Sequence, residues 1–116
     1  MTSKVKYYFY PDGTVGSKVW RNEKGEAHRS DGPAIEYADG RRMWYKNGFL
    51  HREDGPAIEN LFGTRKWYKN GRLHRDDGPA IVWEDNSYSY YLNNKQYSKK
   101  EYWEKIKRIK KGRDKR

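Results

Sequence analysis

Residues 51–58 read HREDGPAI, and this stretch decides the fold because the chain repeats it. Residues 28–35 read HRSDGPAI and residues 74–81 read HRDDGPAI, each 23 positions from the middle copy. Between the copies, WYKNG at residues 44–48 recurs at residues 67–71 and decays to YYLNN at residues 90–94. Residues 20–25, WRNEKG, form a further partial copy with one extra residue before His28. A fixed period with altered end copies is typical of stacked repeat arrays, whose terminal units act as caps.

Each copy has the turn and strand signals of a β-hairpin. The Asn-Gly pairs at residues 47–48 and 70–71 favour type I′ turns, because both central residues of that turn need a positive φ. A second turn is expected at Asp39-Gly40, with equivalents at residues 62–63 and 85–86. The segments between the turns are short and rich in residues that favour strands.

A two-residue turn at Asp39-Gly40 predicts the pairing register. It places Ile35 opposite Trp44, and the same count in the other copies places Ile58 opposite Trp67 and Ile81 opposite Tyr90. The other face then pairs Ala34, Ala57 and Ala80 with Tyr45, Tyr68 and Tyr91, and it sets Glu59 opposite Lys66 as a favourable charge pair. Because Ile–Trp is the bulkier pair, we assign its face to the core.

The C-terminal segment has a helical pattern instead. Ser98 and Glu101 have the spacing of a capping box, Gly112 is a C-terminal stop signal, and the apolar residues between them fall at helical spacing: Tyr102, Trp103, Ile106 and Ile109. We therefore predict a helix over about residues 98–111 that seals one end of the sheet.

The expected fold is all-β. It is a single-layer antiparallel meander of about three 23-residue hairpin repeats with degenerate end repeats, capped by a C-terminal amphipathic helix. The predicted division is a β-hairpin repeat domain at residues 1–97 and a basic helix and tail at residues 98–116.

The composition narrows the functional classes. The 116 residues carry 26 Lys and Arg against 16 Asp and Glu, a formal charge of +10, and 16% of them are aromatic. Residues 98–116 hold ten of the basic and three of the acidic residues, which is +7 of that excess. The sequence has no Cys, which excludes disulfides, thiolate metal sites and a Cys nucleophile. No apolar run reaches the roughly 18 residues of a membrane span, and the N-terminus lacks a signal-peptide pattern. We therefore expect a cytoplasmic protein (in the host cytoplasm if the protein is viral) without membrane insertion.

The repeated histidines, His28, His51 and His74, are interpreted as structural. Equivalent residues of successive hairpins lie about 9–10 Å apart in a sheet, whereas a zinc ion binds nitrogens at about 2 Å. A catalytic site also needs one asymmetric constellation rather than three copies of the same group. We therefore expect no metal, no cofactor and no enzymatic activity. The structural repeat positions are these histidines together with Trp44, Trp67, Asp54 and Asp77.

Repeats of the form WYxNGxLHRxDGPA resemble the MORN-type repeat group (membrane occupation and recognition nexus), in the divergent form seen in bacteriophage, giant-virus and bacterial proteins. The resemblance covers roughly residues 20–97 and leaves out the basic helix. It implies an elongated, single-layer β-meander that serves as a scaffold or binding module. It further implies a phage-encoded factor, for example an inhibitor, that engages a host macromolecule such as a defence system or its nucleic acid.

Two surfaces are candidates for binding. The helix and tail are suited to a polyanion, because clustered Lys and Arg bind phosphates with release of counterions. Their candidate residues are Lys99, Lys100, Lys105, Lys107, Arg108, Lys110, Lys111 and Arg113. A sheet face is the second candidate, with a stacking ladder of Tyr45, Tyr68 and Tyr91 and with Arg52 and Arg75 as phosphate contacts. For the arginines we favour pairing with the Asp two residues later, and for the tyrosines a second packing wall is the alternative role.

We expect a host nucleic acid or an acidic protein surface as the partner, with the chain monomeric or edge-paired as a homodimer. One alternative is a protein-interaction scaffold or inhibitor without nucleic-acid binding, since Trp, Tyr and Arg are typical interface anchors. Another is a sponge for a nucleotide signal, which its ligand would stabilise. Salt separates the first two, because phosphate contacts weaken steeply with ionic strength.

Overall fold

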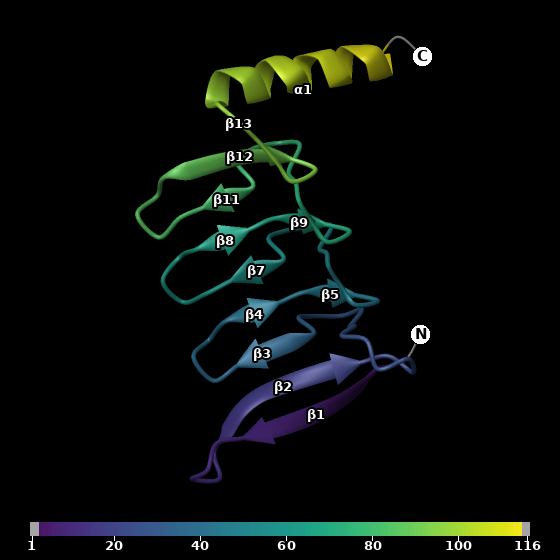
Figure 1. The fold of residues 1–116 in the computed structure, drawn as a ribbon, viewed down its shortest axis with the longest axis vertical. Coiled ribbons are helices and arrows are strands. Elements are labelled where there is room, and N and C mark those ends of the chain that lie inside the picture. Colours follow the sequence, from purple (N-terminus) through teal and green to yellow (C-terminus); the bar gives the residue numbers. More distant parts are fainter. Residues whose placement is uncertain (1–2, 115–116) are drawn as a thin grey trace.

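The computed structural model describes residues 3–114 and shows an elongated molecule of 55 × 35 × 19 Å. Within these residues, nine antiparallel strands follow one another along the long axis, and one helix lies across the C-terminal end (Figure 1). The strand order is β1-β2-β3-β4-β7-β8-β11-β12-β13, so the sheet neighbours are also neighbours in chain order apart from the side hairpins. The expected antiparallel meander with one C-terminal helix is confirmed.

The strands have two or three residues, except for the longer β1, β2 and β12. The meander consists of β1 (Lys4–Phe9), β2 (Val15–Arg21), β3 (Ile35–Tyr37), β4 (Arg42–Met43), β7 (Ile58–Glu59), β8 (Arg65–Lys66), β11 (Ile81–Val82), β12 (Tyr88–Leu92) and β13 (Lys95–Tyr97). Two side hairpins branch from it, β5 (Tyr45–Lys46) with β6 (Phe49–Leu50) and β9 (Tyr68–Lys69) with β10 (Arg72–Leu73). The helix is α1 (Lys99–Asp114).

The side hairpins have the turns that the Asn-Gly pairs predict. Asn47 and Gly48 have φ values of 49° and 85°, and Asn70 and Gly71 have 51° and 80°. Lys46 pairs with Phe49 across the first of these turns, so its loop holds two residues. The positive φ at both positions is the requirement of a type I′ turn, which Asn and Gly meet with the least strain.

The predicted register of the main hairpins is wrong by one residue. Ile35 pairs with Met43 and not with Trp44, because the turn holds three residues rather than two. The Tyr37 N–H donates to the Arg41 carbonyl across that turn, and Gly40 at its end has a φ of 90°. A type I turn followed by a left-handed residue is the usual three-residue hairpin loop.

The same shift occurs in the other copies. Ile58 lies opposite Lys66 and Ile81 opposite Ser89, while Glu59 lies opposite Arg65 instead of Lys66. The predicted Ala–Tyr pairs are wrong as well, since the Ala34 N–H donates to the Met43 carbonyl. Ala34, Ala57 and Ala80 are nevertheless completely buried.

The corrected register separates the isoleucines from the tryptophans. Successive side chains on a strand point to opposite faces, so one face carries an apolar row of the buried Val19 and the half-buried Ile35, Met43 and Ile58. The opposite face carries a row of alternating charge: Lys18, Glu36, Arg42, Glu59 and Arg65. Trp44 belongs to the charged face, since the Arg42 guanidinium carbon lies 5.8 Å from its ring centroid. The assignment of one Ile–Trp core face is therefore wrong.

The densest packing lies under the helix. Tyr90, Leu92, Tyr102 and Ile106 form a buried cluster, with Tyr97, Trp103 and Ile109 packed against it. Tyr90 stands at the position that Trp44 and Trp67 hold in the repeats, and its ring centroid is 4.9 Å from that of Tyr102. The prediction that the apolar stripe of the helix covers the end of the sheet is confirmed.

The start of the helix agrees with the sequence, but its end does not. The Glu101 N–H donates to Ser98 Oγ at 3.1 Å and the Ser98 N–H donates to Glu101 Oε1 at 3.2 Å, which is the predicted capping box. The helix continues through Gly112 to Asp114, so the predicted stop is wrong. A Gly inside an exposed helix costs about 1 kcal/mol relative to Ala and does not by itself end the helix.

Candidate nucleic-acid interface

The loop after each repeated His fixes an Arg side chain. The guanidinium carbon of Arg52 lies 3.8 Å from the centroid of the Trp44 ring, and its Nε donates to Asp54 at 3.2 Å. A terminal nitrogen of Arg52 also donates to the Pro56 carbonyl at 3.0 Å. Arg75 makes the same three contacts with Trp67, Asp77 and Pro79, and Arg29 makes them with Trp20, Asp31 and Pro33.

These contacts determine whether the repeat arginines are free to bind an external anion. The side chain of Arg52 is 23% exposed, and its donors face an Asp carboxylate, a carbonyl and, at 4.0 Å, Glu59. The pairing with the Asp two residues later, which the sequence favoured, is present in all three copies. Arg52 and Arg75 are the candidate phosphate contacts of the sheet face. Their guanidinium groups are therefore already bonded to other groups of the protein.

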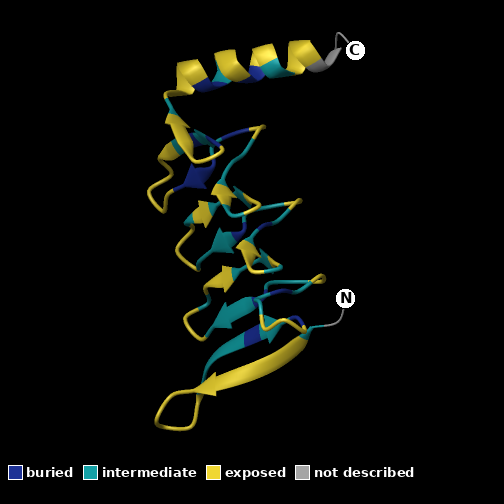
Figure 2. Ribbon diagram, turned by 45° about the vertical axis from the view of Figure 1, so that its right-hand side comes forward, coloured by how far each residue is buried: buried dark blue, intermediate teal, exposed yellow. Residues whose placement is uncertain are grey.

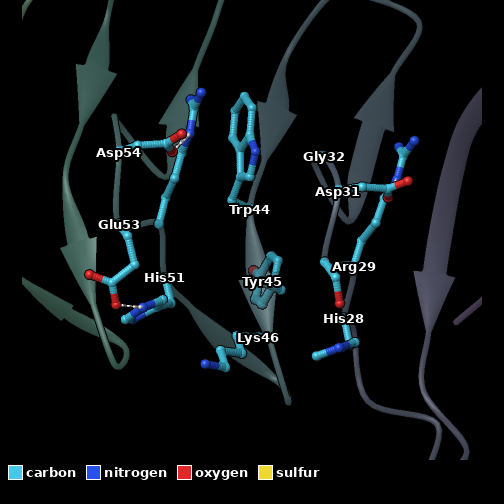
Figure 3. Close-up of a pocket in the computed structure, with 12 residues that line it drawn as sticks. His28, Arg29, Asp31, Gly32, Trp44, Tyr45, Lys46, His51, Glu53 and Asp54 are labelled. Carbon is cyan, nitrogen blue, oxygen red and sulfur yellow. Dashed lines mark hydrogen bonds and ion pairs between the residues drawn. The ribbon is translucent and has the colours of Figure 1, made fainter. Parts of the chain in front are cut away.

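The predicted tyrosine ladder lies in the grooves between these loops. Tyr45 stands between residues 28–32 and 51–54, which line a groove of about 750 Å³ (Figure 3). An equivalent groove of about 590 Å³ contains Tyr68. Burial raises the pKa of both Tyr45 and Tyr68, which agrees with rings that are partly covered. Tyr45, Tyr68 and Tyr91 are all half-buried, so each ring is only partly free to stack with a ligand.

The repeated histidines join each copy to the next one. Nδ1 of His28, His51 and His74 accepts the backbone N–H of Asn47, Asn70 and Asn93 at 3.0, 2.9 and 3.1 Å. The backbone N–H of His51 donates in turn to the Trp44 carbonyl. Among the described residues, no group of His and acidic side chains is arranged to hold a metal ion.

The second nitrogen of these histidines differs between copies. Nε2 of His51 lies 2.7 Å from the Glu53 carboxylate. In the first copy the equivalent of Glu53 is Ser30, and the buried Nε2 of His28 has no partner within residues 3–114. In the third copy, burial lowers the pKa of His74 and the nearby Asp76 opposes that shift.

The outward face of α1 is a basic surface. The seven predicted residues whose side chains are described are all exposed: Lys99, Lys100, Lys105, Lys107, Arg108, Lys110 and Lys111. Among the side chains that the structure describes, none of the seven makes an ion pair, whereas all three repeat arginines do. Glu101 is held in the capping box, which lowers its pKa. The side chain of Arg113 is not among those that the structure describes.

One exposed apolar site was missed from the sequence. Leu61 and Phe62 at the β7–β8 turn are 76% and 77% exposed. The equivalent turns carry Asp12, Asp39 and Asp85, whose carboxylates accept a backbone N–H two residues later. Asn60 takes over that role for the β7–β8 turn by accepting the N–H groups of Phe62 and Thr64. An alignment of the turn sequences would have identified this site, because only the β7–β8 turn has an apolar residue where the others have Asp.

No protein-family model matches the chain, and comparison with curated proteins and with solved structures gives no match either. Across the described part of the chain, no helix has both the length and the apolar character that crossing a membrane requires. The geometry of the chain itself is thus the basis for a functional proposal.

Proposed function

We propose that this protein binds nucleic acid through the exposed basic face of α1 and catalyses no reaction. The observation that carries the proposal is the row of seven exposed Lys and Arg side chains without carboxylate partners among the described residues. Such side chains are free to replace the counterions of a phosphate backbone, and the released counterions supply the affinity.

The packing under the helix supports this role. Tyr102 and Ile106 are buried, and the Tyr102 hydroxyl bonds both the Arg75 carbonyl and the Gly78 N–H of the last repeat loop. A helix that is fixed along one face loses little further freedom when the other face binds a ligand. The apolar residues of the helix are occupied by this docking, so they do not compete for a membrane surface.

In this proposal the sheet is a rigid support for the helix, and it consists of about three MORN-type hairpin repeats with modified ends. The recurrence of the Arg–Trp stack and of the His–Asn link at each copy supports that reading. A phage-encoded protein of this design would engage host nucleic acid, or the nucleic acid of a host defence system, in the cytoplasm.

The test is a binding titration with labelled single- and double-stranded DNA and RNA over a salt series from about 50 to 200 mM. The wild-type chain is compared with the triple variant Lys107→Gln, Arg108→Gln, Lys111→Gln. A matched control removes three exposed lysines of the sheet: Lys24→Gln, Lys46→Gln, Lys69→Gln.

We expect steeply salt-dependent binding. Each helix charge that contacts a phosphate adds about 0.7–0.9 to the slope of log K against log salt, so the helix variant loses up to about two to three units and the control keeps its slope. Equal losses in the two variants would assign the binding to net charge alone. No binding at low salt by the folded chain would refute the proposal and would favour an acidic protein surface as the partner.

A further inference from the structure

The end of the molecule opposite α1 has an open sheet edge. β1 is the first strand of the sheet and pairs only with β2, while the far end is covered by the helix (Figure 1). All six residues of β1 are exposed, and Figure 2 shows the strand exposed along its whole length. In an antiparallel strand alternate residues turn their N–H and C=O groups outward. Natural sheets usually protect such an edge, because it can pair with another strand.

The two faces of this edge differ in chemistry. Lys4, Lys6 and Tyr8 lie on one face of β1, and Arg21 lies opposite Lys4 on the same face. The Lys6 Nζ and the Arg21 guanidinium carbon are 5.3 and 5.6 Å from the centroid of that ring. Within the described residues these three cations form no ion pair with a carboxylate.

The opposite face of β1 is apolar. It presents Val5, Tyr7 and Phe9, which are 42%, 44% and 61% exposed. Trp20 lies opposite Val5 on the same face, and Lys18 lies over the Tyr7 ring at 5.4 Å. A strand added at this edge would therefore have alternate side chains beside lysines and beside aromatic rings, since successive side chains point to opposite faces.

We propose that the outer edge of β1 binds an extended peptide segment of a partner protein in which acidic and apolar residues alternate. The segment adds a tenth strand to the sheet, and the main-chain hydrogen bonds supply the common affinity. Its carboxylates face Lys4 and Lys6, and its apolar side chains cover Val5, Tyr7 and Phe9. Cross-strand neighbours of opposite charge and aromatic pairs both favour this register.

A second copy of the chain is a poorer occupant of the same edge. In a two-fold antiparallel pairing of two β1 strands centred on Lys6, Lys6 lies opposite Lys6 and Lys4 opposite Tyr8, because directly opposite residues share a face. One face of the joint then holds four lysines from the two copies and no acidic residue. The net charge of +10 on each chain adds further repulsion.

The experiment uses the full chain and a labelled octapeptide of alternating Glu and Val. Two control peptides accompany it: one has four Glu followed by four Val, and one has the alternating sequence with N-methyl groups on every second backbone nitrogen. The second is made in both registers, because methylation blocks pairing only where it falls on the edge that faces β1. Amide hydrogen exchange locates the peptide on the protein.

We expect the alternating peptide to bind, to slow exchange at alternate amides of β1, and to outcompete both the block peptide and one of the two methylated forms. The variant Lys4→Glu, Lys6→Glu is expected to weaken binding about tenfold, as two cross-strand pairs become repulsive. The helix variant Lys107→Gln, Arg108→Gln, Lys111→Gln should change this affinity less than twofold, which is within about 0.4 kcal/mol.

Three results would overturn the proposal. One is equal binding of the block and alternating peptides, and another is protection confined to α1, which would assign the peptide to the basic helix. The third is a concentration-dependent dimer of the free chain that Lys4→Glu, Lys6→Glu alters, since a second copy would then occupy the edge. None of these results bears on nucleic-acid binding by α1, so the two proposals fail independently.

Discussion

The repeat arginines of the sheet and the basic residues of the helix hold their positive charge in opposite ways. In the sheet, Arg29, Arg52 and Arg75 each stack on a Trp ring and bond an Asp and a carbonyl. On α1, the described Lys and Arg side chains are exposed and have no carboxylate partner within the described residues. A charge that is stacked and paired contributes to the fold, while a solvated charge is free for an external anion. Composition alone does not separate the two, since both regions are rich in basic residues.

The largest expected effect comes from truncating Tyr102, the side chain that packs the helix against the sheet. This side chain is completely buried, and its ring centroid lies 4.9 Å from that of Tyr90. Tyr102→Ala should lower the free energy of unfolding by about 3–5 kcal/mol, the usual cost of truncating a buried aromatic residue. Urea unfolding followed by circular dichroism measures the loss.

Tyr102→Phe is the matched control for that change. It keeps the ring and removes only the hydroxyl bonds to the Arg75 carbonyl and the Gly78 N–H. The expected loss is about 1–3 kcal/mol, because the buried Gly78 N–H and the part-buried Arg75 carbonyl lose this partner. Equal losses in the two variants would mean that the hydroxyl, rather than the packing of the ring, attaches the helix.

A second prediction compares the two kinds of charge directly. Arg52→Gln removes one basic charge together with its stack and its bonds to Asp54 and Pro56, and we expect a loss of about 1.5–3 kcal/mol of unfolding free energy. The salt slope of nucleic-acid binding should not change. Arg108→Gln removes the same charge from the helix, and it should lower the salt slope by up to about 0.9 with little change in stability. The reverse assignment of effects would contradict the comparison between sheet and helix.

A smaller effect is expected inside the sheet, at the first copy. Ser30→Glu places a carboxylate at the position that Glu53 holds in the second copy, to bond His28 Nε2, which has no partner among the described residues. A hydrogen bond to this buried donor should raise the free energy of unfolding by about 1 kcal/mol. Glu53→Ser is the reciprocal change and should lower stability at neutral pH. Thermal unfolding of both variants measures these changes in stability. Unchanged stability in both variants would show that the contact between His Nε2 and a carboxylate does not stabilise the fold.

The smallest expected effect is a dependence on pH at His74. Burial lowers the pKa of His74 below its usual 6.5, so the unfolded chain binds more protons there than the folded protein does. The stabilising contribution is complete above about pH 6.5 and is lost as the pH falls through that value towards the folded pKa. The nearby Asp76 opposes this lowering of the pKa, and Lys69 adds to it.

The melting temperature at about pH 7.5 and about pH 5.5 checks this prediction. The wild-type chain should lose more stability between the two values than His74→Gln does. The exposed carboxylates with lowered pKa values, such as Asp39 and Asp85, lose their contribution only at lower pH, below their ordinary value of 3.8. A variant with the same pH dependence as the wild type would place the titrating group elsewhere.

The sequence alone predicted the local structure correctly where particular residue types favour one backbone conformation. The Asn-Gly pairs predicted their turns because few residues accept two positive φ values in succession, and Ser98 with Glu101 predicted the start of α1. The pairing of each repeat Arg with its Asp followed from a separation of two residues. The 23-residue period predicted a meander with a modified end.

Other features depended on contacts between distant residues, so only the tertiary structure decided them. Whether Asp39-Gly40 closes a two- or three-residue loop changes the register by one, and that shift moved the tryptophans to the face opposite the isoleucines. The links from His Nδ1 to the next copy span 19 positions, and the contact of Tyr102 with Arg75 spans 27. The sequence determined the Asn-Gly turns, the repeat and the distribution of charge, because these depend on neighbouring residues. The structure decided which charges are paired and which edge stays open, because both depend on where separate strands meet in space.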